Sequence, residues 1–481
     1  NTDRGKQTMR SIIFDFADNN EQNLYIQIFD YIKGKILSGE FELGTKLPSL
    51  RQLAKENGIS VTTVETAYNQ LLVEGYIESR PKSGYYVSDD ISGAVGNGST
   101  SGELTLDELR PPESTKTVKE RSLIYDEESF EFSKWKKCMS KVFNDYAYAL
   151  QSEADVQGEA ALRYEIAKYL YAGRGVKCSP DQVVIGAGSQ QLATHLIRIL
   201  RELGISNAAM ESPGYGPVRE IFKDEGVSLS NIPVKDNGIV IERLPVNMRS
   251  LVYVNPSNQF PSGAVMPIGR RYELIKWAEA NDSYILEDDY DSELRYFGKP
   301  IPALQGLDRS GRVVYLGSFS STLFASIKIS YMVLPKELME IFDRIKSKYS
   351  QTCSKAEQIC LALYMDNGYY YRHIKKCRKR KSEKLHTTME MFREYGEGLI
   401  EALDSKSGLA VMLRIKAPVP VEQLCKVGKD VGLMMNPVTD LCTEDEQVLY
   451  FYFYRVSEPL LRLLIKMFVG NIKKGMRNIN A

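Results

Sequence analysis

A stretch rich in Gly, Ser and Pro separates this chain into two parts with different hydrophobic patterns. Between Asp89 and about Thr115 the sequence contains SGAVGNGSTSGE and then RPPEST, which is typical of a flexible linker because it has little apolar surface to bury. A chain of 481 residues is also too long for one ordinary core. We therefore expect the following organisation: an N-terminal tail over 1–22, a small domain over 23–88, a linker over 89–124 and a large domain over 125–481, with a smaller subdomain from about 354.

The part before the linker carries three helical patterns and then two strand-like runs. Ile28, Ile32 and Ile36 recur at four-residue spacing, which predicts an amphipathic helix. Runs at 76–78 and 85–87 predict a hairpin. Capping serines and terminating glycines set the expected bounds of the helices, which are 23–38, Ser49–Gly58 and Ser60–Gly75. Two helices joined by a tight Gly-containing turn and followed by a hairpin are typical of a winged helix-turn-helix.

The second helix of such a motif enters the major groove of DNA with its first residues toward the bases. Hydroxyl groups there can reach phosphates or bases, and methyl groups can touch thymine. Arginine and lysine residues nearby suit contacts with phosphates. The predicted DNA-binding residues are therefore Arg51, Ser60, Val61, Thr62, Thr63, Arg80 and Lys82.

The segment LPSLRQLAKENGISVTTVETAYNQLLVEGYIESRPKSGYYV, residues 47–87, resembles the winged helix of the GntR family of regulators over its full length. The resemblance implies double-stranded operator DNA as a partner. Many relatives carry Arg directly after the helix-capping Ser, whereas this chain has Val61, so its operator contacts are expected to differ. The alternative is a module that binds only proteins, as some winged helices do.

Strand-like runs alternate with helical stretches after the linker, at 183–185, 251–254, 284–286 and 313–316. This alternation predicts an α/β domain with a mostly parallel sheet. Polar groups near the ends of such strands suit a phosphate-bearing aromatic cofactor, which needs helix N–H groups for its phosphate, a carboxylate for its ring nitrogen and a ring to stack on. The candidates are Gly188, Ser189 and Gln190 for the phosphate, Tyr215 for stacking, Asp288 for the ring nitrogen, Tyr290 for a phenolate and Arg455 for the carboxylate of an effector. Asn258 and Gln259 are either further pocket groups or turn formers beside prolines.

The motifs PGY, PSNQFPSG, EDDYDSE, GSFSSTL and ISYMVLP follow one another along the large domain. In these motifs the domain resembles the fold-type I aminotransferase domain of the MocR/GabR subfamily of GntR-type regulators. The resemblance implies an α/β fold in which a winged helix-turn-helix precedes an aminotransferase-like domain with a mostly parallel central sheet and a smaller C-terminal subdomain. It also implies pyridoxal 5'-phosphate as the cofactor, a small amino compound as the effector and a head-to-tail homodimer.

One motif departs from the family pattern at the position of the Schiff-base lysine. In GSFSSTL this chain has Ser321 where the family has Lys, and Lys328 stands where the family usually has Arg. A Ser hydroxyl cannot form an imine, so we expect no catalytic residue, no transaminase turnover and a cofactor that is bound non-covalently or not at all. The chain is either a natural regulator that has lost covalent binding or a Lys-to-Ser variant. At the position of the family's Arg on the cofactor phosphate, Lys328 keeps the positive charge but lacks the bidentate fork of Arg. Substitution of Lys328 for the Schiff-base Lys is disfavoured because its role and position differ.

The composition argues against several other classes of protein. No stretch approaches the roughly 18 apolar residues of a membrane span, and the first residues do not resemble a secretion signal. The seven scattered Cys indicate free thiols in a reducing cytoplasm. The scattered Cys and the presence of just three His argue against a metal site. Because the net charge is zero, DNA binding must depend on local placement of charge. The basic run at 371–384 is either a second DNA-contacting surface or, as we favour, a solvated helix face.

The sequence therefore favours a cytoplasmic transcription regulator whose large domain senses pyridoxal phosphate, an amino compound or both. Two alternatives stay open at this point. The chain could be a pyridoxal-phosphate-dependent aminotransferase with an accessory DNA-binding module, or a cofactor-free dimerisation scaffold. Retention of the cofactor and its covalent attachment distinguish the three.

Overall fold

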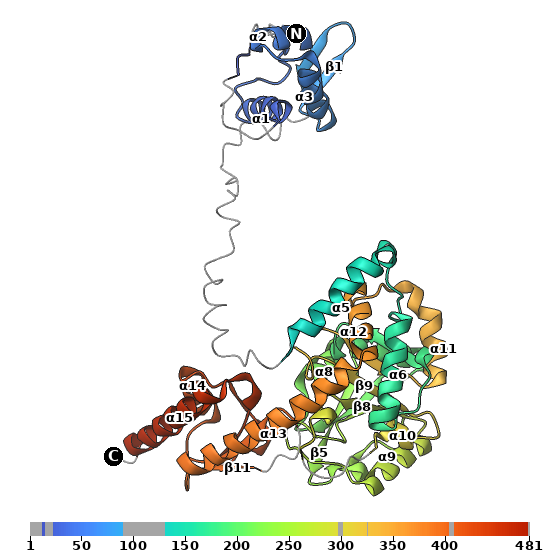
Figure 1. The fold of residues 1–481 in the computed structure, drawn as a ribbon, viewed down its shortest axis with the longest axis vertical. Coiled ribbons are helices and arrows are strands. Elements are labelled where there is room, and N and C mark those ends of the chain that lie inside the picture. Colours follow the sequence, from blue (N-terminus) through green and yellow to red (C-terminus); the bar gives the residue numbers. More distant parts are fainter. Residues whose placement is uncertain are drawn as a thin grey trace. The chain divides into compact units, whose positions relative to one another are not determined.

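The computed structural model describes residues 12–14, 23–89, 130–296, 302–324, 326–403 and 408–479. The chain divides into two compact units, Asn1–Glu113 and Ser114–Ala481 (Figure 1). Most of the expected tail and nearly all of the expected linker lie outside the described residues. Within the ranges given above, no helix is both long enough and apolar enough to cross a membrane.

Three helices and a two-stranded hairpin form the first unit. The elements are α1 (Leu24–Leu37), α2 (Leu50–Asn57), α3 (Val61–Val73), β1 (Ile77–Arg80) and β2 (Gly84–Val87). The predicted stripe faces inward, because Ile28, Ile32 and Ile36 are all 0% exposed. The hairpin is antiparallel, with Ile77 opposite Val87. This order of elements confirms the predicted winged helix-turn-helix.

Two serines and a glycine set the junction between α2 and α3. The Ser49 hydroxyl accepts a hydrogen bond from the Gln52 backbone N–H at 3.3 Å, and the Ser60 hydroxyl accepts one from the Thr63 N–H at 3.0 Å. Between them Gly58 adopts a φ of 66°, a left-handed conformation that favours glycine. The chain therefore ends one helix and starts the next within a few residues, which is the geometry that the motif requires.

An eight-stranded sheet forms the centre of the second unit, in the order β3-β10-β9-β8-β7-β4-β5-β6. The consecutive strands from β9 to β5 are parallel, whereas β10 and β6 run antiparallel to their neighbours. All residues of β7 and β8 are buried, which explains their continuous runs of apolar residues. The strands are β3 (Val183–Gly186), β4 (Asn207–Ser212), β5 (Ser228–Lys235), β6 (Gly238–Ile239), β7 (Leu251–Val254), β8 (Tyr284–Asp289), β9 (Val313–Ser318) and β10 (Ser330–Val333).

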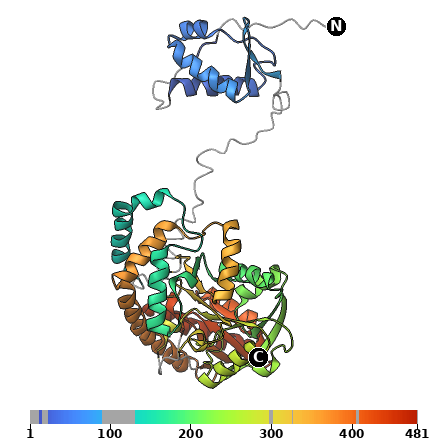
Figure 2. The same ribbon diagram turned by 90° about the vertical axis from the view of Figure 1, so that its right-hand side faces the viewer.

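Helices cover both faces of this sheet (Figure 2). One core joins the sheet to α7, α8 and α11, and a separate core joins it to α9 and α10. A third core packs α5, α6 and α12 together with β3 and β10. The helices are α5 (Phe132–Asp145), α6 (Ala160–Arg174), α7 (Ser189–Glu202), α8 (Gly216–Asp224), α9 (Ile268–Ala280), α10 (Leu304–Leu307), α11 (Lys336–Ile345) and α12 (Lys355–Asp366).

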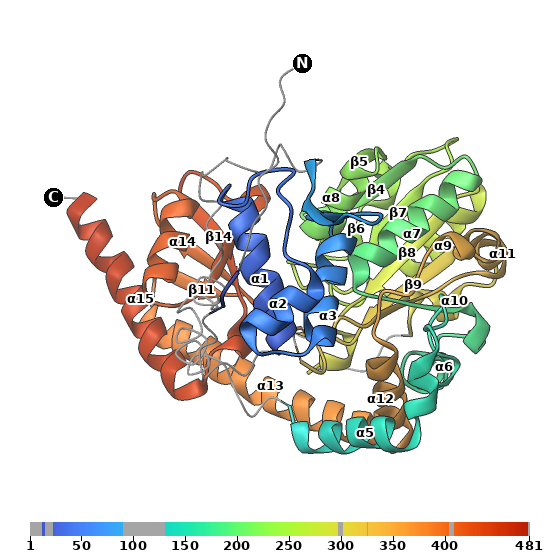
Figure 3. The ribbon, with the colours of Figure 1, turned by 90° about the horizontal axis from the view of Figure 1, so that it is seen from above.

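A long helix, α13 (Tyr369–Tyr395), runs from beside α5 and α12 to the C-terminal subdomain (Figure 3). That subdomain has an antiparallel sheet in the order β11-β12-β14-β13 and its own apolar core. Its elements are β11 (Ile400–Ala402), β12 (Val411–Lys416), α14 (Val421–Asp430), β13 (Met435–Pro437), β14 (Glu446–Phe451) and α15 (Glu458–Ile479). The predicted fold class, α/β with a mostly parallel central sheet and a smaller C-terminal subdomain, is confirmed.

Candidate functional site

The start of α3 divides the predicted base-reading residues into two kinds. Val61 is 44% exposed, and Thr62 is also exposed. Ser60 and Thr63 instead bond to each other, because the Ser60 hydroxyl lies 2.8 Å from the Thr63 hydroxyl and also caps the helix. Val61 and Thr62 are therefore the members of this group whose side chains are exposed and take no part in the cap.

The basic residues predicted to contact phosphates differ in their surroundings. Arg51 and Lys82 are exposed. The Arg80 guanidinium donates to Glu78 Oε1 at 2.5 Å and lies 4.3 Å from the centre of the Tyr86 ring. Since Glu78 offsets part of the charge of Arg80, Arg51 and Lys82 are the better candidates for phosphate contacts.

In the second unit, helix α7 begins at the turn that was predicted to hold a phosphate. Its N-cap residue is Gly188, with a φ of 97° and no side chain to cap the helix. The N–H groups of the first turn, beginning with Ser189 and Gln190, have no partner within the helix. Exposed N–H groups and the helix dipole together favour an anion at such a position. The left-handed conformation also explains why glycine stands there.

Asp288 lies at the end of β8 and is only 6% exposed. The Tyr253 hydroxyl donates to Asp288 Oδ2, and the Asn255 side chain donates to the Asp288 backbone oxygen at 3.0 Å. Burial raises the pKa of Asp288 to about 7, and hydrogen bonds offset part of that effect. Because these partners are neutral, a cation placed against the carboxylate would stabilise its ionised form. A protonated ring nitrogen is such a cation.

Asn258, Tyr290 and Ser321 meet near the same end of the sheet. The Asn258 side-chain amide donates to the Tyr290 hydroxyl at 3.2 Å and to Asp291 Oδ2 at 2.7 Å. The Ser321 hydroxyl donates to the backbone oxygen of Tyr290. Asn258 is therefore a polar group beside Tyr290 and not only a turn former. Gln259 instead joins its own loop to the loop after β4, since its side chain accepts from the Ser262 N–H at 3.2 Å and donates to the Pro213 oxygen at 2.8 Å.

An amine from α13 bonds to Ser321, and sequence reasoning missed this residue. Lys381 Nζ donates to the Ser321 backbone oxygen at 3.2 Å. The available signal was spacing, because Lys381 follows the buried Cys377 by four residues and so lies on the same helix face. Lys328 is exposed, so its side chain points to solvent.

The basic run at 371–384 therefore has two faces. Lys375, Lys376 and Lys379 are exposed, in agreement with a solvated helix face. Lys384 is only 7% exposed, and its amine donates to the Tyr454 backbone oxygen at 3.2 Å. The expectation of a solvated face is wrong for Lys384 and for the partly buried Lys381. Here α13 packs against the segments that carry Tyr454 and Ser321.

Tyr215 lines a cleft of about 640 Å³ between the central sheet and the C-terminal subdomain. The Phe260 ring lies edge-on to Tyr215 at 6.2 Å and to Tyr450 at 5.0 Å, so aromatic rings from both sides line the cleft. Burial raises the pKa of Tyr215, with a smaller contribution from the charge of Asp288. Arg455 ends a short turn, Phe453–Arg455, and its side chain lies outside the described structure.

Several buried polar groups around β4, β7 and β8 support this site and were not predicted. Arg174 donates to Asp289 Oδ2 at 2.7 Å, which holds the end of β8. Burial raises the pKa of Glu211 to about 8, although the Asn255 backbone N–H donates to it at 3.2 Å. Two buried acceptors, Glu211 Oε1 and Asn255 Oδ1, have no hydrogen-bond partner among the described residues. Among all the described residues, no group of three or more His, Cys, Asp or Glu could hold a metal ion.

Sequence comparisons match both units to families. Residues 24–87 match the gntR family of bacterial regulatory proteins, and residues 132–465 match aminotransferase class I and II. The "Uncharacterized HTH-type transcriptional regulator YdeL" of Bacillus subtilis is 40% identical over 417 residues, which cover 86% of this chain and 89% of that protein. The "Probable rhizopine catabolism regulatory protein MocR" of Rhizobium meliloti is 31% identical over 429 residues, which cover 86% of each chain.

Solved aminotransferases share the fold of the second unit. Kynurenine aminotransferase of Pyrococcus horikoshii superposes with a TM-score of 0.63 at 21% identity, covering 77% of this chain and 96% of that one. LysN, an alpha-aminoadipate aminotransferase of Thermus thermophilus complexed with N-(5'-phosphopyridoxyl)-L-leucine, gives a TM-score of 0.63 at 19% identity, covering 78% and 100%. At these identities the likeness extends to the fold alone.

Proposed function

The chain belongs to the MocR/GabR subfamily of GntR-type transcription regulators with an aminotransferase class I and II domain, and from that premise we propose that its second unit is a sensor without transaminase turnover. It is a DNA-binding transcription regulator, as its relatives are named. The proposed ligand is pyridoxal phosphate, a small amino compound or both. A head-to-tail homodimer acting on operator DNA in the cytoplasm is part of the proposal.

The residues that survive in the pocket fit pyridoxal phosphate. The uncapped start of α7, with Gly188, Ser189 and Gln190, would take the phosphate, and Tyr215 would stack on the ring. The buried Asp288 carboxylate would face the ring nitrogen, and the Tyr290 hydroxyl would bond the phenolate oxygen. When bound, the cofactor supplies an aldehyde that reacts with amines. Arg455 is the proposed partner for the carboxylate of an effector.

The observation that carries the proposal is the side chain at position 321. Ser321 stands where the family has its Schiff-base lysine, and its hydroxyl is engaged with the Tyr290 backbone oxygen. A hydroxyl that donates to a carbonyl oxygen is not engaged with a base that could deprotonate it, and it cannot form an imine as an amine does. Lys328 is exposed and so does not replace it. These residues support binding and orientation of a ligand, but not its turnover.

The test uses the full chain mixed with pyridoxal phosphate, dialysed, and then treated with borohydride. We expect the cofactor to be retained, to be released on denaturation and to leave no pyridoxyl-lysine peptide in a digest. A pyridoxyl-lysine peptide would contradict the proposal and favour an enzyme-competent site. Loss of the cofactor on dialysis would favour the dimerisation scaffold.

The regulatory half of the proposal needs a DNA readout on the same samples. The DNA target is found by letting the chain select duplexes from a randomised pool. The sequence shared by the selected duplexes then serves as the operator. We expect pyridoxal phosphate, alone or with an added amino compound, to change the affinity for this target at a fixed salt concentration. The affinity is measured with neither compound, with each alone and with both. Equal affinity for DNA under these four conditions would contradict sensing.

A further inference from the structure

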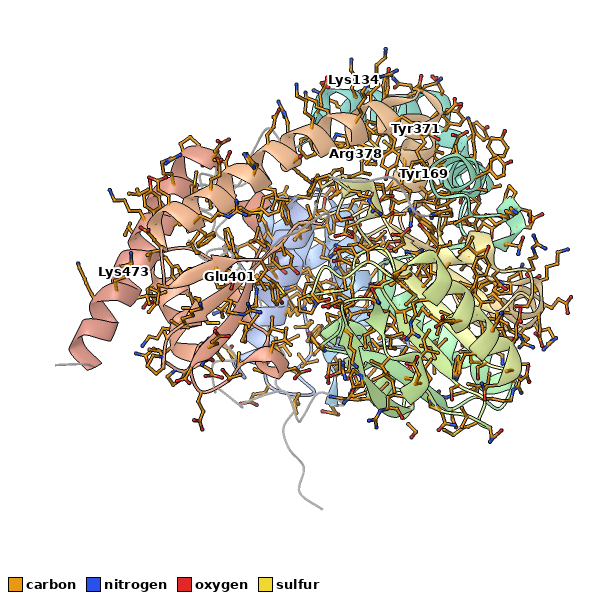
Figure 4. The ribbon with its side chains drawn as sticks, turned by 90° about the horizontal axis from the view of Figure 1, so that it is seen from below. Lys134, Tyr169, Tyr371, Arg378, Glu401 and Lys473 are labelled. Carbon is orange, nitrogen blue, oxygen red and sulfur yellow. The ribbon has the colours of Figure 1, made fainter. Side chains whose placement is uncertain are left out.

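A pocket of about 230 Å³ lies where α5 and α12 approach the first half of α13. Figure 4 shows Lys134 of α5 and Tyr371 of α13 at the same end of the second unit. None of the residues that line this pocket belongs to the proposed cofactor site. We call it the α5–α13 pocket, and it is defined by Lys134, Tyr364, Tyr369, Arg372, Lys376 and Arg380, with Glu131, His373 and Cys377 completing its walls.

Positive charge is concentrated in the α5–α13 pocket. Arg372, Lys376 and Arg380 follow one another at four-residue spacing and so share one face of α13. Like charges at this spacing repel one another, and Lys134 adds a fourth cation from α5. One carboxylate, that of Glu131, also lines the pocket. An anion in the pocket would relieve this repulsion.

The described contacts of two of these cations are with neutral groups. Arg372 donates to the Asn367 backbone oxygen at 2.9 Å, and its guanidinium lies 5.0 Å from the centre of the Tyr369 ring. Lys134 Nζ lies 5.7 Å from the same ring. Both cations are therefore held at the pocket by an aromatic ring, and their charges stay available to a ligand.

We propose that the α5–α13 pocket binds a small phosphate monoester with an aromatic or heteroaromatic ring. Guanidinium and ammonium groups together suit a phosphate, because Arg can contact two of its oxygens and Lys adds a point charge. The partly buried Tyr369 offers its ring to a planar group, whereas Tyr364 is only 1% exposed and forms the floor of the pocket. A duplex is too wide to enter a hollow of this volume, so contacts with DNA would fall to the exposed Lys375 and Lys379 outside it.

His373 connects the α5–α13 pocket to two other parts of the second unit. Its Nε2 lies 2.6 Å from the backbone oxygen of Thr322, the residue after Ser321. Its ring is also edge-on to Phe130, which precedes α5, at 5.0 Å. A ligand in the pocket would therefore contact a side chain that is bonded to the turn carrying Ser321 and packed on a residue just before α5. The site would act as a second input, and it does not depend on the proposed cofactor.

The experiment measures binding to the full chain by equilibrium dialysis, with inorganic phosphate and phenyl phosphate as probes. Ionic strength is held constant with sodium chloride, so that general charge screening is the same throughout. We expect saturable binding of both probes, with phenyl phosphate bound more tightly because its ring meets Tyr369. Absence of saturable binding by either probe would overturn the proposal.

A pair of double variants locates the binding. Arg372→Gln/Lys376→Gln removes two charges from the pocket, and we expect the affinity for phenyl phosphate to fall at least roughly tenfold. Lys375→Gln/Lys379→Gln removes the same charge from positions on the same helix that do not line the pocket, and it should leave the affinity within about twofold. Equal losses in both would overturn the proposal, since they would indicate a general field and not a pocket.

The same variants also test the alternative that the pocket cations bind DNA and not a small phosphate. The affinity of each variant for a fixed duplex is measured over a range of salt concentrations, because the salt dependence becomes weaker when a cation that binds a DNA phosphate is removed. We expect the pocket variant to keep the salt dependence of the parent. A reduced slope in this variant, together with unchanged binding of phenyl phosphate, would assign these cations to DNA and overturn the proposal.

Discussion

Each unit has a helix whose first turn is a candidate binding site, but these two helices start in opposite ways. In the first unit the Ser60 hydroxyl caps α3, so the N–H of Thr63 is already bonded and the side chains of Val61 and Thr62 face outward. In the second unit α7 starts at Gly188, which has no side chain to cap the helix. One terminus can recognise a ligand through side chains, and the other through its backbone.

This difference determines which changes each unit can tolerate. A side-chain exchange such as Val61 for the Arg of many relatives can alter recognition by α3 and leave the helix intact, because the cap lies on a different residue. The proposed phosphate cradle of α7 depends on a backbone conformation, so few side chains are compatible with it. In the proposed function, the loss of turnover depends on the single side chain at position 321 and leaves this backbone conformation unchanged.

The largest expected effect concerns that side chain. Ser321→Lys restores an amine next to Tyr290 and Asn258, so borohydride should fix pyridoxal phosphate on residue 321 in the variant and on no residue in the parent. Mass spectrometry of digested protein locates the adduct. Ser321→Ala is the control, because it loses the hydroxyl and gains no amine. The amine of Lys381 lies 3.2 Å from the backbone oxygen of Ser321. An adduct at Lys381 in the parent would contradict the prediction that the parent has no residue that forms an imine.

The next effect concerns the charge of Asp288. Its pKa of about 7 lies above the value near 3.9 of an unfolded Asp, so the buried ionised carboxylate costs folding free energy above about pH 7 and this cost falls as the pH falls. A bound ring cation needs the ionised form. We therefore expect cofactor retention by the parent to weaken about tenfold per pH unit below about pH 7.

Asp288→Asn separates charge from shape at the same position. We expect its cofactor affinity to be lower by roughly tenfold to a hundredfold and its pH dependence in this range to disappear. Equilibrium dialysis between about pH 8 and pH 6 measures both. At pH 8 the cofactor-free variant should be at least as stable to heat as the parent, because the costly charge is gone. A steep pH dependence that survives in the variant would assign the titration to another group.

Local signals in the sequence were sufficient for most elements of the fold. The Ile28, Ile32 and Ile36 stripe and the capping Ser60 predicted their helices because both signals act over a few residues. The buried runs of β7 and β8 predicted strands for the same reason. The place of β10 between β3 and β9, antiparallel to both, was not predictable in this way, since it depends on pairing between distant segments.

The candidate site was predictable only as a set of separate residues. Gly188, Asp288 and Ser321 stood out because each lies in a motif at the end of a strand. Their partners did not, because Tyr253 reaches Asp288 across 35 positions and Lys381 reaches Ser321 across 60. These contacts exist only once the sheet and α13 have assembled. The basic run at 371–384 shows the same limit, since only packing reveals that Lys384 is buried.

A smaller effect concerns the backbone at the start of α7. Gly188→Ala introduces a side chain at a φ of 97° and a ψ of 162°, a conformation essentially restricted to glycine, which costs about 1–3 kcal/mol, although no atom lies within 4 Å of the new Cβ. If the bound state needs this conformation, cofactor affinity should fall roughly tenfold. Gly204→Ala is a matched control near the other end of α7, with a φ of 72° and the same open space. It should lower stability by a similar amount and leave cofactor affinity unchanged, so equal losses of affinity would refute a local role for Gly188.

The smallest effect tests the two helix starts directly, by making the same substitution in each. Ser60→Ala removes the cap of α3 and should cost about 1 kcal/mol, which gives roughly fivefold faster hydrogen exchange in peptides from α3. Ser189→Ala lies one residue inside α7, whose N-cap is Gly188, so exchange in α7 should change much less. Ser60→Asp keeps an acceptor at the cap and should restore slow exchange, which separates capping from a general loss of structure. If Ser189→Ala loosened α7 as much as Ser60→Ala loosens α3, α7 would depend on a side-chain cap as well. Its backbone N–H groups would then be less available to a phosphate than the geometry at Gly188 implies.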